Sequence, residues 1–171
     1  TGEIIAPANT SLTFWPQALF SRNGNFLYSF HVSSDGYRVN RFNDDGTLAQ
    51  TASSGWSGSA PELRKKLVID LSGKFIYGMN ALNQGVISFV PVINNGTDLD
   101  PANGVAYSTD GTTSNELLMH PDGKFLYALV GNSIYWFTID QSTGHLTSSG
   151  SISNGVTAFS GAFHPDGEWL Y

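Results

Sequence analysis

Cysteine is absent from this 171-residue sequence, and only 13% of its residues are charged. The lack of cysteine excludes disulfides, thiolate nucleophiles and thiolate metal ligands. Lys and Arg total 8 against 14 Asp and Glu without forming a basic stripe, so a nucleic-acid partner has no electrostatic support. The 4 His residues do not have the spacing of a metal motif. We therefore expect no cofactor, no metal and no nucleic-acid partner.

Long apolar segments are lacking as well. No run approaches the roughly 20 residues that a membrane-spanning helix needs, so we expect no membrane insertion. Residues 1–4 lack the basic and apolar regions of a signal peptide. The low lysine content is typical of an extracellular surface, and we expect a secreted, periplasmic or cell-surface protein rather than a cytoplasmic one.

Hydrophobic residues make up 40% of the chain, which is enough for one domain with a real core. The polarity comes from Ser, Thr, Asn and 19 Gly rather than from charge. This composition favours β-structure with many turns over disorder.

One phrase, a turn glycine followed two residues later by an aromatic-x-Tyr triplet, occurs four times. Its glycines are 49, 50 and 44 residues apart, at Gly24, Gly73, Gly123 and Gly167. A second phrase, an alternating apolar run and then a turn with Gly-x-Leu, follows the first three copies and also opens the chain. The periods within each unit are those of strands, so each unit is predicted to form four antiparallel strands.

Four strands repeated every 40 to 50 residues are typical of a β-propeller blade. A β-sandwich is the alternative, but it has no reason to repeat its turn chemistry at this spacing. We predict an all-β partial ring of about three complete four-stranded blades and two partial ones. The predicted segments are an outer strand of a preceding blade at 1–13, blades at 14–58, 59–109 and 110–155, and the first hairpin of the next blade at 156–171.

The termini of the chain therefore cut through blades, which leaves strand edges open. A seven-bladed ring needs roughly twice these residues at this repeat length. We expect a fragment or one side of a composite ring. Its partner would be the remaining half of the propeller or a second copy that pairs the open blade edges.

The segments 119–127, 134–146 and 163–171, with their His-Pro-Asp-Gly and Ile-Tyr-Trp-Phe phrases, resemble the 6-phosphogluconolactonase-like seven-bladed propellers. Residues 77–80 are similar to the Tyr-Val-Thr-Asn repeats of surface-layer propellers. The resemblance implies a seven-bladed ring and hydrolysis of a sugar lactone. It also implies an Arg-His pair before the inner strand, and no unit of this chain keeps that pair. The His position holds Gln17, Lys66, Glu116 and Ser160, and the Arg position holds Pro16, Lys65, Asn115 and Phe159.

Three residues are candidates for catalysis. Lys66 and Glu116 occupy equivalent positions on neighbouring inner strands, so we expect them to approach each other at the mouth of the channel. Glu116 would act as a base while Lys66 holds an oxyanion, although a plain ion pair between blades explains the same positions. His31 ends a strand near the loops of the ligand face, where it is either a base or a histidine bonded to a neighbouring serine.

Four further residues are candidates for ligand contacts. Trp56 lies in a Ser- and Gly-rich loop, where an aromatic plate among hydroxyls suits a sugar or peptide; alternatively it plugs the space between blades. Arg64 begins the only basic run, which binds an anion or is simply solvated. Asn80 aligns with His31, and Asp110 lies in a second polar loop. His120 and His164 are predicted to hydrogen-bond within turns, and His145 to face solvent.

These residues support two functions. The absent Arg-His pair and the polar Trp56 loop favour a non-catalytic module that presents its loops to a carbohydrate or protein ligand. The alternative is a lactonase-like hydrolase, and the resemblance alone supports it.

Overall fold

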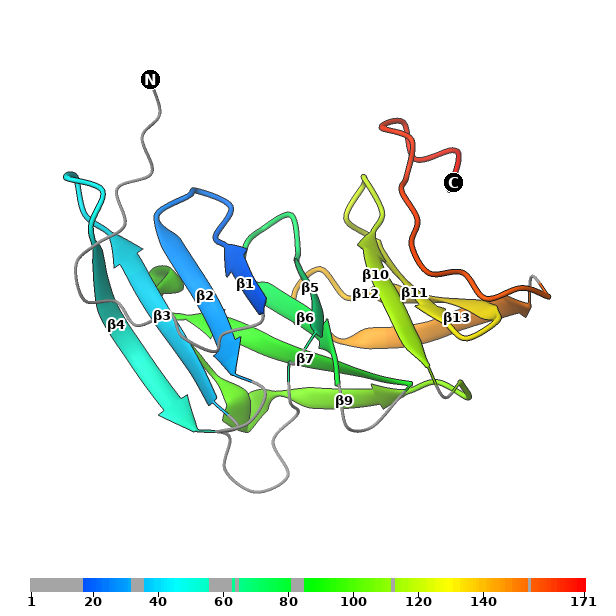
Figure 1. The fold of residues 1–171 in the computed structure, drawn as a ribbon, viewed down its shortest axis with the longest axis horizontal. Helices are drawn as coiled ribbons and strands as arrows, with labels where there is room; N and C mark the ends of the chain where they lie inside the picture. Colours follow the sequence, from blue (N-terminus) through cyan, green and yellow to red (C-terminus); the bar gives the residue numbers. More distant parts are fainter. Residues whose placement is uncertain are drawn as a thin grey trace.

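The computed structural model describes three antiparallel β-sheets arranged side by side (Figure 1). The described residues are 17–31, 36–55, 63, 65–80, 85–111, 113–153 and 155–171. The predicted outer strand at 1–13 lies outside them. Each sheet places four strands in the order in which they follow one another in the sequence, which confirms the predicted propeller blades.

The first sheet, blade 1, and the third sheet, blade 3, are simple four-stranded meanders. Blade 1 consists of β1 (Gln17–Phe20), β2 (Phe26–His31), β3 (Gly36–Phe42) and β4 (Leu48–Gly55). Blade 3 consists of β10 (Ser114–Met119), β11 (Phe125–Val130), β12 (Ser133–Ile139) and β13 (Leu146–Ser153).

Blade 2 differs from the other two in its outermost strand. Its inner strands are β5 (Lys65–Ile69), β6 (Phe75–Met79) and β7 (Val86–Ile93). Two short strands, β8 (Asp98–Leu99) and β9 (Val105–Ser108), share the position beside β7. The 3₁₀ turns η1 (Asn94–Gly96) and η2 (Pro101–Asn103) precede and separate them. Pro101 cannot donate to a strand ladder, which accounts for the break.

A short hairpin is present at residues 162–171, within the segment predicted to begin the next blade. Ala162 and Tyr171 exchange two backbone hydrogen bonds of 3.0 and 2.9 Å, and the His164 N–H donates to the Trp169 carbonyl. Phe163 pairs with Leu170 as an isolated bridge rather than as part of a longer strand.

Two kinds of turn lie at one end of every blade, because strands alternate in direction. The inner turns join the first two strands, at 21–25, 70–74 and 120–124, and are found along the upper edge of Figure 1. The outer turns join the third strand to the fourth, at 43–47, 94–97 and 140–145. The second and fourth strands end at the opposite end of each blade, which we call the loop end.

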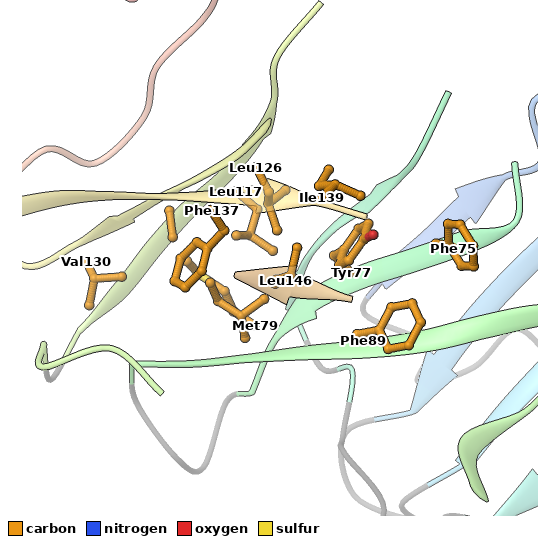
Figure 2. Packing of buried hydrophobic residues seen from close by; sticks show 12 residues of the cluster. Phe75, Tyr77, Met79, Phe89, Leu117, Leu126, Val130, Phe137, Ile139 and Leu146 are labelled. Carbon is orange, nitrogen blue, oxygen red and sulfur yellow. The ribbon is translucent and has the colours of Figure 1, made fainter. Parts of the chain in front are cut away.

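The core lies between blades, not within them. In the repeated aromatic-x-Tyr phrase the two aromatic residues face the following blade, and the residue between them faces the preceding one. Phe75 and Tyr77 therefore pack against blade 3, whereas Ile76 packs against blade 1. Figure 2 shows the cluster between blades 2 and 3, in which Leu117, Leu126 and Phe137 meet the side chains of β6.

The tyrosines of the first two phrases also make a polar contact with the next blade. The Tyr28 hydroxyl donates to the Gly96 carbonyl at 3.1 Å, and the Tyr77 hydroxyl donates to the Gly144 carbonyl at 2.7 Å. Both acceptors lie in outer turns. Burial raises the pKa of Tyr28 to about 12 and raises the pKa of Tyr77 still further. The contact repeats because the tyrosine and the turn glycine repeat.

The third phrase tyrosine lacks this cover. Tyr28 and Tyr77 are 0% exposed, whereas Tyr127 is only partly buried and meets the Phe163 ring edge to face, at 5.0 Å between ring centroids. Three further aromatic side chains close to Phe163 in the sequence are exposed: Phe159, Trp169 and Tyr171. The forward side of blade 3 is thus an aromatic face that the described chain covers only in part. We call it the open face.

Across the described ranges, no helix has the length and apolarity needed to cross a bilayer.

Candidate functional site

The first strands of the three blades, β1, β5 and β10, lie next to one another around the inner side of the assembly. Two of them carry a β-bulge near the loop end. In β5 the pairing shifts between Lys65 and Val68, and in β10 it shifts between Ser114 and Glu116. A bulge turns a side chain out of the regular alternation, and bulges are frequent beside active sites.

The bulge in β5 places Lys66 in the left-handed region, with φ of 53°. For a residue with a Cβ this conformation costs about 1–2 kcal/mol. Strain of this kind persists only where surrounding contacts hold it, and it is enriched at functional sites. Lys66 is therefore fixed in an unfavourable conformation that re-aims its side chain.

The re-aimed side chain meets the residue at the equivalent bulge of the next blade. The Lys66 Nζ donates to the Glu116 Oε2 at 3.1 Å, and the side chains are 38% and 20% exposed. This confirms the predicted approach of the two residues across neighbouring inner strands. The pair is reachable from solvent, and it places a carboxylate and an ammonium group side by side at the loop end.

Two polar side chains next to Glu116 anchor its strand. Ser114 is 6% exposed and accepts a hydrogen bond from the Gly85 N–H at 3.0 Å. Asn115 is 8% exposed, and its Nδ2 donates to the Ala158 carbonyl at 2.8 Å. These bonds tie the bulge to the link before β7 and to the segment after β13. Apart from the polar character of both residues, no sequence pattern predicts these two hydrogen bonds.

Of the remaining predicted residues, the structure describes the side chains of Asn80 and Asp110 alone. Asn80 is only 5% exposed, and its N–H donates to the Val86 carbonyl. It is therefore buried in blade 2 and not on the surface. Asp110 is exposed on the segment after β9. His31 ends β2, and its side chain lies outside the described structure. Trp56 and Arg64 also lie outside it.

The histidines at the opposite end act as predicted in their turns. His120 places its Nδ1 2.7 Å from the Asp122 Oδ1 and its Nε2 3.1 Å from the Gly167 carbonyl. His164 Nδ1 lies 2.8 Å from the carboxylate of Asp166. His145 is exposed, as expected, although its Nδ1 also lies 2.8 Å from the Tyr107 hydroxyl. In the part of the chain that the structure describes, no three metal-ligating side chains converge.

Comparison with known proteins points to one family. Residues 16–171 match the family model described as lactonase, 7-bladed beta-propeller. A 6-phosphogluconolactonase from Formosa agariphila is 28% identical over 180 residues, which cover 99% of this chain and 50% of that protein. The chain thus spans about half the length of the curated relative it matches.

Solved structures share the fold at low sequence identity. A protein of Bacteroides fragilis provisionally named 6-phosphogluconolactonase has a TM-score of 0.70 at 23% identity, with 90% of this chain and 46% of that one covered. Its counterpart from Bacteroides uniformis has a TM-score of 0.73 at 21% identity, with 90% and 45% covered. The periplasmic gluconolactonase of Pseudomonas aeruginosa has a TM-score of 0.66 at 19% identity, with 80% and 39% covered.

Proposed function

The chain belongs to the lactonase family of 7-bladed β-propellers, and we propose that it forms about half of a ring that hydrolyses a sugar lactone. The curated relative that matches 99% of this chain is a 6-phosphogluconolactonase, which supports a hydrolase more than a non-catalytic binding module. The hydrolase was the alternative that the sequence offered, and the comparisons now favour it.

The observation that carries this proposal is the 3.1 Å pair of Lys66 and Glu116 on two bulged inner strands. Lactone opening needs a base that activates water and a positive group that stabilises the developing oxyanion. No unit of this chain keeps the Arg-His pair that the resemblance implies. The proposal therefore assigns the base and the positive group to other residues. A carboxylate and an ammonium group stand at the equivalent slots in this chain.

In the proposed reaction, Glu116 takes a proton from water as the water oxygen bonds to the lactone carbonyl carbon. Lys66 lies beside the oxyanion that forms on the carbonyl oxygen. As the tetrahedral intermediate collapses, the ring C–O bond breaks and the leaving alkoxide takes the proton from Glu116. The sum is lactone plus water giving a hydroxy acid, with both side chains restored.

We further propose that another blade of this repeat covers the open face. Tyr28 and Tyr77 become fully buried when a following blade supplies an outer-turn carbonyl, and Tyr127 has the same position in the third phrase. The chain covers 50% of its relative's length, which supports a covering unit from the rest of a ring. An exported location also stays a proposal, supported by the sequence composition.

Lactone turnover tests the function. Light scattering first establishes the mass of the assembled form of the chain. This form is then mixed with a sugar δ-lactone, and the release of acid above the spontaneous rate is recorded. Glu116→Gln removes the base at constant volume and should lower kcat about 100-fold. Lys66→Met removes the oxyanion donor and should also lower kcat about 100-fold.

Glu168→Gln and Lys124→Met, exposed residues in inner turns at the other end, are the matched controls and should retain full turnover. Equal turnover in all four variants would overturn the proposal. Absence of turnover in the assembled ring, together with glycan or protein binding that Trp56→Ala abolishes, would instead support the non-catalytic module.

A further inference from the structure

A groove lies between blades 1 and 2 at the end that carries the turns, opposite the Lys66–Glu116 pair. Its walls are the inner turns of the two blades and the outer turn of blade 2, and its volume is about 500 Å³. A second hollow of about 590 Å³ adjoins it, and Asn23, Phe26, Asn94 and Asn95 line both. The inner turns that border it lie at the upper edge of Figure 1.

The groove exists because blades 1 and 2 pack more loosely at this end than the later units do. A methyl group added to Gly73 would lie 3.5 Å from the Arg22 side chain, an ordinary contact distance. At the equivalent Gly123 and Gly167 the same group would lie only 2.7 Å from Leu71 and His120. Arg22 therefore occupies a position that Leu71 fills tightly in the next unit.

Arg22 is held in place and still has donors to offer. Its Nε donates to the Asp70 carbonyl and its Nη2 to the Ile69 carbonyl, both at 2.9 Å. A guanidinium group has five N–H donors, so two bonds leave three for a ligand. Lys74 lines the same groove from blade 2. The groove thus has a guanidinium group held by two hydrogen bonds and an exposed lysine side chain.

No acidic side chain among the described residues lines the 500 Å³ groove, although the chain as a whole has a net charge of −6. Asp70, in the inner turn of blade 2, is 7% exposed, and its carboxylate is bonded within its own turn. It accepts hydrogen bonds from Ser72 and from the N–H groups of Lys74 and Phe75. Arg41 and Asp44 both line the adjoining hollow.

Two asparagines add amide groups at the rim. Asn94 and Asn95 both have left-handed backbones, with φ of 52° and 57°. Strained residues of this kind cluster at ligand clamps as well as at active sites. They follow the end of β7, where blades 1 and 3 have turns without a left-handed residue other than glycine.

We infer that this groove binds a small organic anion, with its phosphate or carboxylate group between Arg22 and Lys74 and its polar remainder on Asn94 and Asn95. Anionic oxygens form charge-assisted hydrogen bonds with both cations, and those bonds are stronger than neutral ones. The site is separate from the proposed lactone site at the loop end, so it goes beyond the proposed function.

Titration of the ¹⁵N-labelled chain with inorganic phosphate and, separately, with citrate tests the inference, with sodium chloride at matched ionic strength as reference. Saturable amide shifts confined to residues 22–23, 72–74 and 94–96 are expected with at least one anion. Saturation by phosphate alone assigns a phosphate ligand, and saturation by citrate alone assigns a carboxylate ligand.

Arg22→Leu installs the residue that the next unit carries at this position, and Lys74→Ala removes the ammonium group. Each should weaken binding about tenfold, the effect of one charge-assisted bond. Lys124→Ala, the equivalent lysine of blade 3, is the matched control and should bind as the unchanged chain does. Thermal melting verifies that each variant folds. Shifts that do not saturate, or an equal loss in Lys124→Ala, would overturn the inference.

Discussion

Lys66 shows how much a single residue depends on its surroundings. Its left-handed backbone would relax to an extended strand if β5 had no bulge, and the ammonium group would then leave Glu116. The sequence places both residues at equivalent positions of two units, which is why their approach was predictable. The bulges and the strain were not, because neither residue has the turn chemistry that marks such sites.

At the same scale, the buried tyrosines predict loss of stability at alkaline pH. Burial raises the pKa of Tyr77 above its ordinary value near 10, so the folded state keeps its proton while the unfolded state loses it. The stabilising effect is complete below pH 10 and declines as pH rises. Each such tyrosine should lower the free energy of unfolding by about 1.4 kcal/mol per pH unit.

Urea unfolding between pH 8 and pH 11 measures this slope. Tyr77→Phe should reduce the dependence of the free energy of unfolding on pH by the contribution of one tyrosine. Leu126→Ala, in the same core cluster, lowers stability without removing an ionisable group, and the slope should be unchanged. A slope in Tyr77→Phe as steep as in the unchanged chain would contradict the assignment.

At the scale of elements, turns determine how closely neighbouring blades approach. Gly144 in the outer turn of blade 3 has φ of 76°, and a methyl group there would lie 2.5 Å from the Phe75 ring of blade 2. Its carbonyl also accepts the Tyr77 hydroxyl. One glycine thus satisfies a turn conformation and a contact between blades.

Gly131 provides the comparison, since it has φ of 58° and open space around its α-carbon. Gly131→Ala should cost about 1 kcal/mol, the backbone penalty alone. Gly144→Ala should cost about 1–3 kcal/mol more because overpacking is added. Thermal or urea unfolding of both variants checks the difference, and equal losses would show that blades 2 and 3 separate easily at this turn.

At the scale of the whole molecule, the cores lie between blades, so each blade depends on its neighbours. Buried clusters lie between blades 1 and 2 and between blades 2 and 3, whereas among the described residues only the short hairpin at 162–171 covers the open face. Stability should therefore fall from the middle of the chain toward this end.

Amide hydrogen exchange in the chain alone should show this gradient. Amides of 162–171 are expected to exchange with an opening free energy near zero, and those of β6 with one near the global value. Light scattering on the same sample reports the mass. Protection of the hairpin in a dimer would mean that a second copy covers the open face, and protection in a monomer would contradict the proposed covering blade.

The sequence by itself determined the blade and its repetition, because turn glycines and alternating apolar residues act over a few residues. It also indicated the family, through phrases that build those turns. It placed Lys66 and Glu116 at equivalent positions of neighbouring units and so predicted that they approach each other. The roles of His31, Trp56 and Arg64 stay predictions. Only the tertiary structure decided the bulges that join Lys66 to Glu116, the tyrosine bonds to outer-turn carbonyls and the groove at Arg22. Those features depend on the distance between neighbouring blades, which is set by side chains about fifty residues apart and by no local pattern.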